Sequence, residues 1–123
     1  MNESSLAREA SAVVAEILAE LPPDVREQAK SVPVLLQAAP GRDVLDEGFE
    51  PDLLGLFTGS PLGAEYSAGN PEAPRIILYT ANLWDLAEGE MEAFRAEVRL
   101  TFLHELGHFL GWDEGQVAAR GLD

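Results

Sequence analysis

The sequence predicts an α+β fold. Two amphipathic helical patterns lie at its ends, one near the N-terminus and one ending at Gly111, and three short apolar segments of strand character lie between them. Hydrophobic residues make up 46% of the 123 positions, which is enough to form a core in a chain of this length. No repeat or low-complexity tract interrupts this order, so we expect residues 1–123 to form one domain.

The N-terminal quarter of the chain is predicted to be helical. Apolar residues recur at helical spacing over residues 4–21, and Pro22 ends the pattern because proline cannot continue a helix. A short second helix is expected over residues 23–31, with acidic side chains near its start. Residues 1–29 are therefore interpreted as an N-terminal helical segment.

Three strands are expected in the middle of the chain. They cover residues 32–38, 53–58 and 75–80, which are short, apolar and bounded by proline, glycine or acidic residues. The stretch 40–51 between the first two strands is polar and acidic, and it is predicted to be a loop. The stretch 64–74 contains a Gly-Asn-Pro sequence that favours a loop before the third strand.

The longest helical pattern runs from Gly89 to Gly111, after a turn or short helix at residues 82–89. Gly111 is expected to end it, because glycine readily adopts the left-handed conformation that closes helices. A short terminal helix is expected over residues 112–122. The apolar face of the long helix is formed by Phe94, Val98, Phe102, Leu103, Leu106 and Leu110.

The chain's two histidines, His104 and His108, lie four residues apart in this helix and enclose Glu105. Side chains at positions i and i+4 of a helix share one face, so both imidazoles can bind one metal ion. The glutamate beside the first histidine then lies close enough to take a proton from a water molecule at that metal. This His-Glu-x-x-His arrangement is typical of zinc-dependent hydrolases, and it predicts a zinc site with Glu105 as general base.

A two-histidine site needs a third protein ligand. The chain has no cysteine, so nitrogen and oxygen atoms must hold the metal. Glu114 stands six residues beyond His108 and occupies the third-ligand position of the extended pattern His-Glu-x-x-His-x-x-Gly-x-x-ligand. Asp113 is the alternative if the turn after Gly111 shifts by one residue, and Asp123 is a more distant candidate.

Composition limits the possible partners. Twenty-two acidic residues against eight basic ones give a formal net charge of −14, which disfavours binding to nucleic-acid phosphates. A charge of this size keeps a small domain soluble, and it can also attract basic substrates. No apolar run is long enough to span a membrane, and the N-terminus lacks the features of a secretory signal. We therefore expect a cytoplasmic protein that contacts neither nucleic acid nor membrane.

Three stretches give the chain a specific resemblance. They are Pro-Asp-Leu-Leu-Gly-Leu-Phe-Thr-Gly-Ser-Pro-Leu at residues 51–62, Pro-Arg-Ile-Ile-Leu-Tyr at residues 74–79, and the helix of residues 97–111 with its His-Glu-x-x-His motif. In this order and spacing, the chain resembles the small bacterial zincin-like metallopeptidase family over residues 30–118. The resemblance implies a small mixed β-sheet packed against helices, among them the helix with the motif.

The resemblance also implies a function. His104 and His108 would bind Zn²⁺ with a carboxylate as third ligand, and Glu105 would activate a water molecule that hydrolyses a peptide bond in a peptide or protein substrate. An extended substrate can pair with an exposed sheet edge, for which residues 75–80 are the candidate. Two alternatives remain open: a zinc-binding regulatory or interaction module without catalysis, and a zincin scaffold that has lost its metal.

Overall fold

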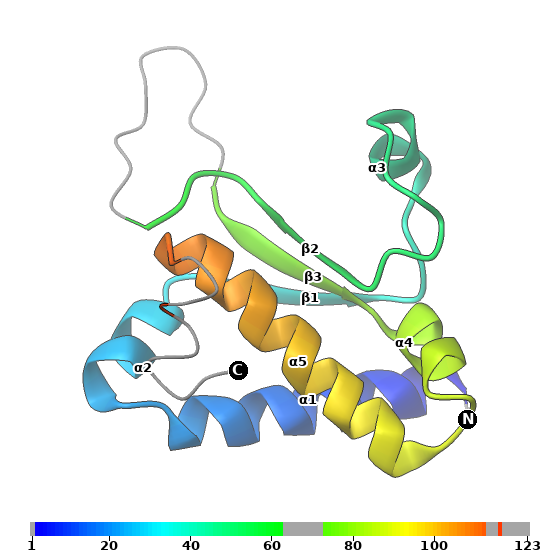
Figure 1. Cartoon of the computed structure of the whole chain (residues 1–123), viewed down its shortest axis with the longest axis horizontal. Coiled ribbons are helices and arrows are strands. Elements are labelled where there is room, and N and C mark those ends of the chain that lie inside the picture. Colours follow the sequence, from blue (N-terminus) through cyan, green and yellow to red (C-terminus); the bar gives the residue numbers. More distant parts are fainter. Residues whose placement is uncertain (1, 63–72, 113–115, 117–123) are drawn as a thin grey trace.

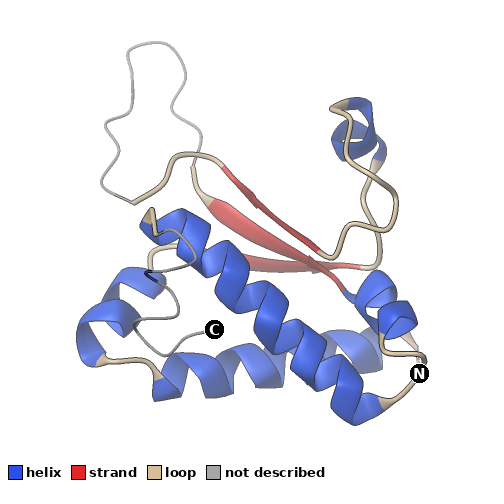
Figure 2. Ribbon diagram, viewed as in Figure 1, coloured by secondary structure: helices blue, strands red, loops and turns tan. Residues whose placement is uncertain are grey.

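The computed structural model describes residues 2–62, 73–112 and 116. Within these residues, helices cover one face of a small mixed sheet and a short helix lies over the other (Figures 1 and 2), which confirms the predicted α+β class. The elements in chain order are α1 (Glu3–Glu20), α2 (Pro23–Ala29), β1 (Val34–Gln37), α3 (Arg42–Asp46), β2 (Gly55–Thr58), β3 (Arg75–Tyr79), α4 (Thr80–Leu86) and α5 (Met91–Leu110).

Helices α1 and α2 form the predicted N-terminal helical pair. The side chain of Asn2 accepts a hydrogen bond from the backbone N–H of Ser5 at 2.8 Å, which satisfies one of the free donors at the start of α1. At the other end, the guanidinium of Arg26 in α2 donates hydrogen bonds to three carbonyl oxygens at the end of α1, at 2.8–2.9 Å. This one side chain caps α1 and joins the two helices.

The sheet has the strand order β1-β3-β2, with β1 parallel and β2 antiparallel to β3. The mixed sheet confirms the expectation, but the assignment of residues 75–80 to an exposed edge is wrong. β3 is the central strand, because Ile76 and Leu78 are buried on the helical face while Ile77 and Tyr79 are buried on the opposite face. A strand that buries both faces belongs in the middle of a sheet.

The main core lies between the sheet and helices α1, α4 and α5, where β3 contributes Ile76 and Leu78. A smaller core on the other face contains Val44, Leu56, Ile77 and Tyr79. Val44 belongs to α3, which falls within the stretch 40–51 that was predicted to be a loop. Only one of the five residues of α3 is buried, so the sequence carries no helical periodicity there.

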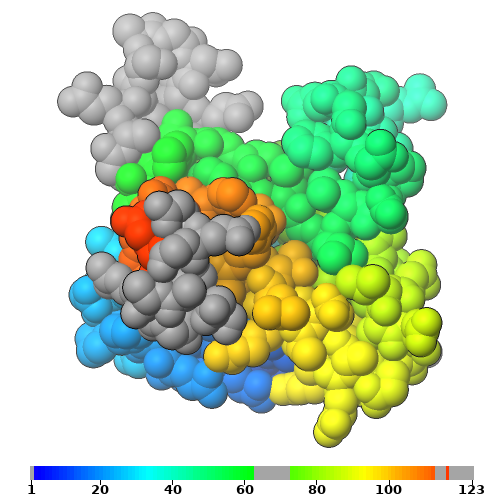
Figure 3. Space-filling view, in the orientation of Figure 1, coloured from blue at the N-terminus to red at the C-terminus, as the bar shows by residue number. Residues whose placement is uncertain are grey.

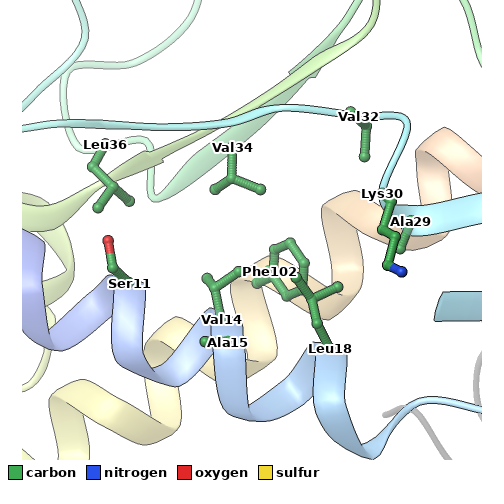
Figure 4. Close-up of a pocket in the computed structure, with 10 residues that line it drawn as sticks. All are labelled: Ser11, Val14, Ala15, Leu18, Ala29, Lys30, Val32, Val34, Leu36 and Phe102. Carbon is green, nitrogen blue, oxygen red and sulfur yellow. The ribbon is translucent and has the colours of Figure 1, made fainter. Parts of the chain in front are cut away.

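A hollow of about 410 Å³ separates α1 from β1 on the helical side of the sheet (Figure 4). The side chains of Val14 and Leu18 line it from α1, those of Val34 and Leu36 line it from β1, and the ring of Phe102 from α5 lines it as well. None of the three residues of the His-Glu-x-x-His motif lines it. The hollow is therefore separate from the metal motif.

Helix α5 runs diagonally across the sheet and brings the motif to the side of β2 (Figure 1). The carboxylate of Glu90 accepts hydrogen bonds from the N–H groups of Glu92 and Ala93, which caps the start of α5. Arg95 of α5 forms ion pairs with Glu9 and Glu16 of α1, which fix the two helices side by side. No helix in the described part of the chain is long and apolar enough to cross a membrane.

Candidate metal centre

The His-Glu-x-x-His motif lies in the last two turns of α5. Phe102, Leu106 and Phe109 are buried on the side of the helix that faces the sheet and α1. His104 and His108 lie one turn apart on the exposed side, as their spacing predicted. These buried apolar residues thus fix the rotation of α5 so that both imidazoles face solvent.

The two imidazoles are close enough to share a ligand. The Nε2 atoms of His104 and His108 are 3.0 Å apart, and the ring planes are nearly perpendicular, at 87°. Two nitrogens that bind one tetrahedral zinc ion at 2.0–2.1 Å are separated by about 3.3 Å. The potential ligand atoms of His104, Glu105 and His108 all lie within 4.8 Å of one another. This donor set fits a divalent metal ion such as zinc.

Glu105 is half-buried between α5 and the sheet. Burial raises the pKa of this carboxyl group above its ordinary value, while His104, His108 and a hydrogen bond from the backbone N–H of Phe57 act in the opposite direction. A carboxylate with a raised pKa holds a proton more readily at neutral pH than a solvated one. The environment of Glu105 therefore suits a group that accepts and returns a proton.

Strand β2 approaches α5 closely at Gly55. A methyl group at this position would lie 2.6 Å from Cγ2 of Thr101 and 3.5 Å from Cγ of Glu105. Further along the strand, the rings of Phe57 and Phe109 pack edge to face with centroids 5.9 Å apart. Gly55 was missed as a site residue from the sequence, although a glycine inside an apolar strand is a recognised sign of close backbone approach.

The outer edge of β2 faces the proposed base. The N–H of Tyr79 donates to the carbonyl of Leu54 at 3.0 Å, so alternate residues of β2 bond to β3. By this alternation the backbone groups of Gly55 and Phe57 point away from β3, which agrees with the hydrogen bond from Phe57 to Glu105. Among the residues that the structure describes, β2 pairs with β3 alone, so its second edge carries no strand partner and only the N–H of Phe57 is used there, by Glu105.

Helix α5 ends as predicted at Gly111, whose φ of 75° places it in the left-handed region. The N–H of Trp112 donates to the carbonyl of Gly107 at 2.9 Å, and the N–H of Gly111 donates to that of His108 at 3.1 Å. This pair of bonds is the Schellman arrangement, which reverses the chain at a helix end. The third-ligand candidates Glu114, Asp113 and Asp123 lie outside the described residues, and so does most of the expected terminal helix.

Tyr79, the last residue of β3, lies near the motif helix in the sequence, but its side chain does not face that helix. Its side chain is fully buried in the small core on the face of the sheet away from α5. Its hydroxyl oxygen has no hydrogen-bond partner among the described residues. Burial and the nearby Asp43 raise the pKa of this hydroxyl, and Arg75 lowers it. Tyr79 therefore packs in the core and does not join the three motif residues.

Two comparisons with known proteins bear on this geometry. A family model described as zincin-like metallopeptidase matches residues 29–122, a range that includes the sheet and α5 with its motif. A comparison with curated proteins finds no match.

Proposed function

Since the chain belongs to the zincin-like metallopeptidase family, we propose that it hydrolyses peptide bonds at a zinc ion held by His104 and His108. The observation that carries this proposal is the 3.0 Å separation of the two Nε2 atoms, with the carboxylate of Glu105 beside them. Both imidazoles are exposed, so a substrate can reach the ion from solvent.

A bound zinc ion would supply a Lewis acid that polarises a carbonyl group and makes a water molecule more acidic. We propose Glu114 as its third ligand, on the spacing of six residues from His108, with Asp113 as the alternative. The Schellman turn at Gly111 supports this assignment, because it reverses the direction of the chain directly after the second histidine.

Glu105 is proposed as the general base. Its carboxylate removes a proton from the attacking water and then delivers that proton to the nitrogen of the leaving amine. Two features of its surroundings support this role: burial raises its pKa, and a hydrogen bond from the backbone N–H of Phe57 favours its charged form. A positioned base of this kind typically contributes a factor of about 10²–10⁴ to the rate.

The substrate is proposed to bind as an extended strand along the outer edge of β2. This edge takes the place of residues 75–80 as the candidate for substrate pairing, because β3 is central and has no free edge. Pairing to β2 places the main chain of a peptide beside Gly55 and Phe57, and therefore next to Glu105. The absence of a side chain at Gly55 leaves room for close approach between this edge and α5.

The proposal is tested with purified protein loaded with zinc. Elemental analysis gives the metal content, and mass spectrometry follows cleavage of a mixed peptide library. We expect about one zinc per chain and hydrolysis that falls at least about 100-fold in Glu105→Gln, with zinc retained. The matched control is Glu92→Gln at the exposed start of α5, which should cleave at the wild-type rate.

Undiminished hydrolysis by Glu105→Gln would remove this residue from the mechanism. Zinc binding without cleavage of any peptide would contradict the peptidase assignment and favour the non-catalytic zinc module instead. A protein that binds no zinc would contradict both.

A further inference from the structure

A groove of about 700 Å³ lies on the face of the sheet opposite α5, under α3. In the space-filling view, α3 projects beyond the body formed by the strands and α5 (Figure 3). Val44 and Leu56 form part of the floor of the groove, and the ring of Phe49, which is 39% exposed, adds a further apolar surface. The carboxylates of Asp43 and Glu47 lie at its α3 side. The groove thus combines an apolar floor with an acidic rim.

Strand β2 connects this groove to the proposed active site. Gly55 and Phe57 face α5, where they contact Thr101 and Phe109. Leu56 points to the opposite face, where it lines the groove. Side chains alternate in the same way along any strand that pairs with β2. In a bound peptide, the neighbours of the residue that faces Glu105 therefore direct their side chains toward the groove face.

The charges of the groove indicate which side chain fits. Asp43 and Glu47 are both exposed, and neither forms an ion pair within the described part of the chain. Among the described residues that line the groove, the one cation is Arg75, whose Nε donates a hydrogen bond to the hydroxyl of Thr58 at 3.1 Å. Arg75 begins β3, whereas Asp43 lies directly before Val44 and Glu47 lies three residues after it. Val44 packs on Ile77 and Tyr79, later in the same strand. The α3 side of the groove is therefore negative.

We propose that this groove is a specificity site for an arginine or lysine side chain of the substrate, next to the residue whose bond is cleaved. Such a side chain has an aliphatic stem that suits Val44 and Leu56, and a cationic end that suits Asp43 and Glu47. The net charge of −14 attracts basic peptides to the same molecule. The inference rests on the proposed peptidase function, because it uses pairing of the substrate to β2.

The test compares fluorescein-labelled peptides that differ at one position, which carries arginine, norleucine or glutamate. Cleavage by the zinc-loaded protein gives kcat/KM for each peptide, and fluorescence anisotropy with the zinc-loaded Glu105→Gln variant gives the affinity. We expect the arginine peptide to be preferred over norleucine by about tenfold in both measurements, with glutamate last. In the double variant Asp43→Asn/Glu47→Gln, this ratio should fall toward one.

The control is Asp46→Asn, which removes one charge from the same short helix at a residue that does not line the groove. It should keep the arginine preference. Equal affinities for the arginine and norleucine peptides, or a preference that persists in the double variant, would overturn the inference while leaving the peptidase proposal intact. If no peptide is cleaved, the peptidase proposal fails, and the anisotropy ratio alone then decides whether the groove selects basic side chains.

Discussion

The backbone N–H of Phe57 donates a hydrogen bond to the carboxylate of Glu105, and this bond joins the edge strand to the motif helix. The base is thus held by the same strand that is proposed to bind the substrate. Any change that moves β2 away from α5 would alter both the orientation of Glu105 and the path of the peptide. The spacing between these two elements is therefore the first property to test.

Gly55→Ala should lower both the stability of the protein and its rate of peptide hydrolysis. The new methyl group would lie 2.6 Å from Cγ2 of Thr101, so either β2 or α5 must shift. Overpacking of this kind costs about 1–3 kcal/mol of stability. We expect a loss in that range by urea denaturation, and a larger proportional loss in peptide hydrolysis, because Glu105 is displaced as well.

A second substitution provides the control for this prediction. Thr101→Ser removes the methyl group that Gly55→Ala would strike and keeps the hydroxyl. The double variant Gly55→Ala/Thr101→Ser should recover part of the lost stability and activity, giving a favourable coupling energy in a double-mutant cycle. Recovery is partial because the new methyl group still lies 3.2 Å from the backbone oxygen of Ile77. Additive effects of the two substitutions would show that the strand-to-helix spacing is not set by this contact.

The contact between Gly55 and α5 could not be predicted from the sequence. The motif spacing places His104, Glu105 and His108 on one helix, and the structure brings their ligand atoms together. Local periodicity cannot reveal which strand lies beside that helix, because strand order depends on contacts distant in the sequence. For this reason β3 was expected at an edge although it is central, and β2, although expected as a strand, was not identified as the edge beside the motif. The fold class needed only local patterns and the family resemblance.

Tyr79→Phe should stabilise the protein at neutral pH. The hydroxyl of Tyr79 is buried without a hydrogen-bond partner among the described residues, and a buried unsatisfied polar group costs about 1–3 kcal/mol. Phenylalanine keeps the ring that packs against Val44 and Leu56. We expect the free energy of unfolding to rise by about 1 kcal/mol in urea titrations. Tyr79→Leu, which removes the ring, should instead be destabilising; a destabilised Tyr79→Phe would mean that the hydroxyl has a partner.

The free energies of unfolding of the wild type and Tyr79→Phe should differ further at alkaline pH. Burial raises the pKa of Tyr79 above its ordinary value of 10.0. The folded state therefore keeps the proton at a pH where the unfolded chain loses it. The associated stability is fully present below pH 10.0 and is lost as the pH rises through the folded-state pKa. Wild type should lose up to about 1.4 kcal/mol per pH unit relative to Tyr79→Phe in this window, measured by urea denaturation from pH 8 to 11. Parallel curves for the two proteins would contradict the raised pKa.

The third zinc ligand can be assigned by single substitutions after Gly111. Glu114→Ala should lower zinc affinity strongly, because a site left with two imidazoles lacks the three protein ligands that catalytic zinc requires. Asp113→Ala and Asp123→Ala serve as charge-matched controls and should bind zinc like the wild type. Competition with a chelating dye gives the zinc affinity, and His108→Ala shows the affinity of a site that has lost one histidine ligand. If Asp113→Ala loses zinc while Glu114→Ala keeps it, the turn after Gly111 presents the earlier carboxylate and the ligand spacing is five residues instead of six.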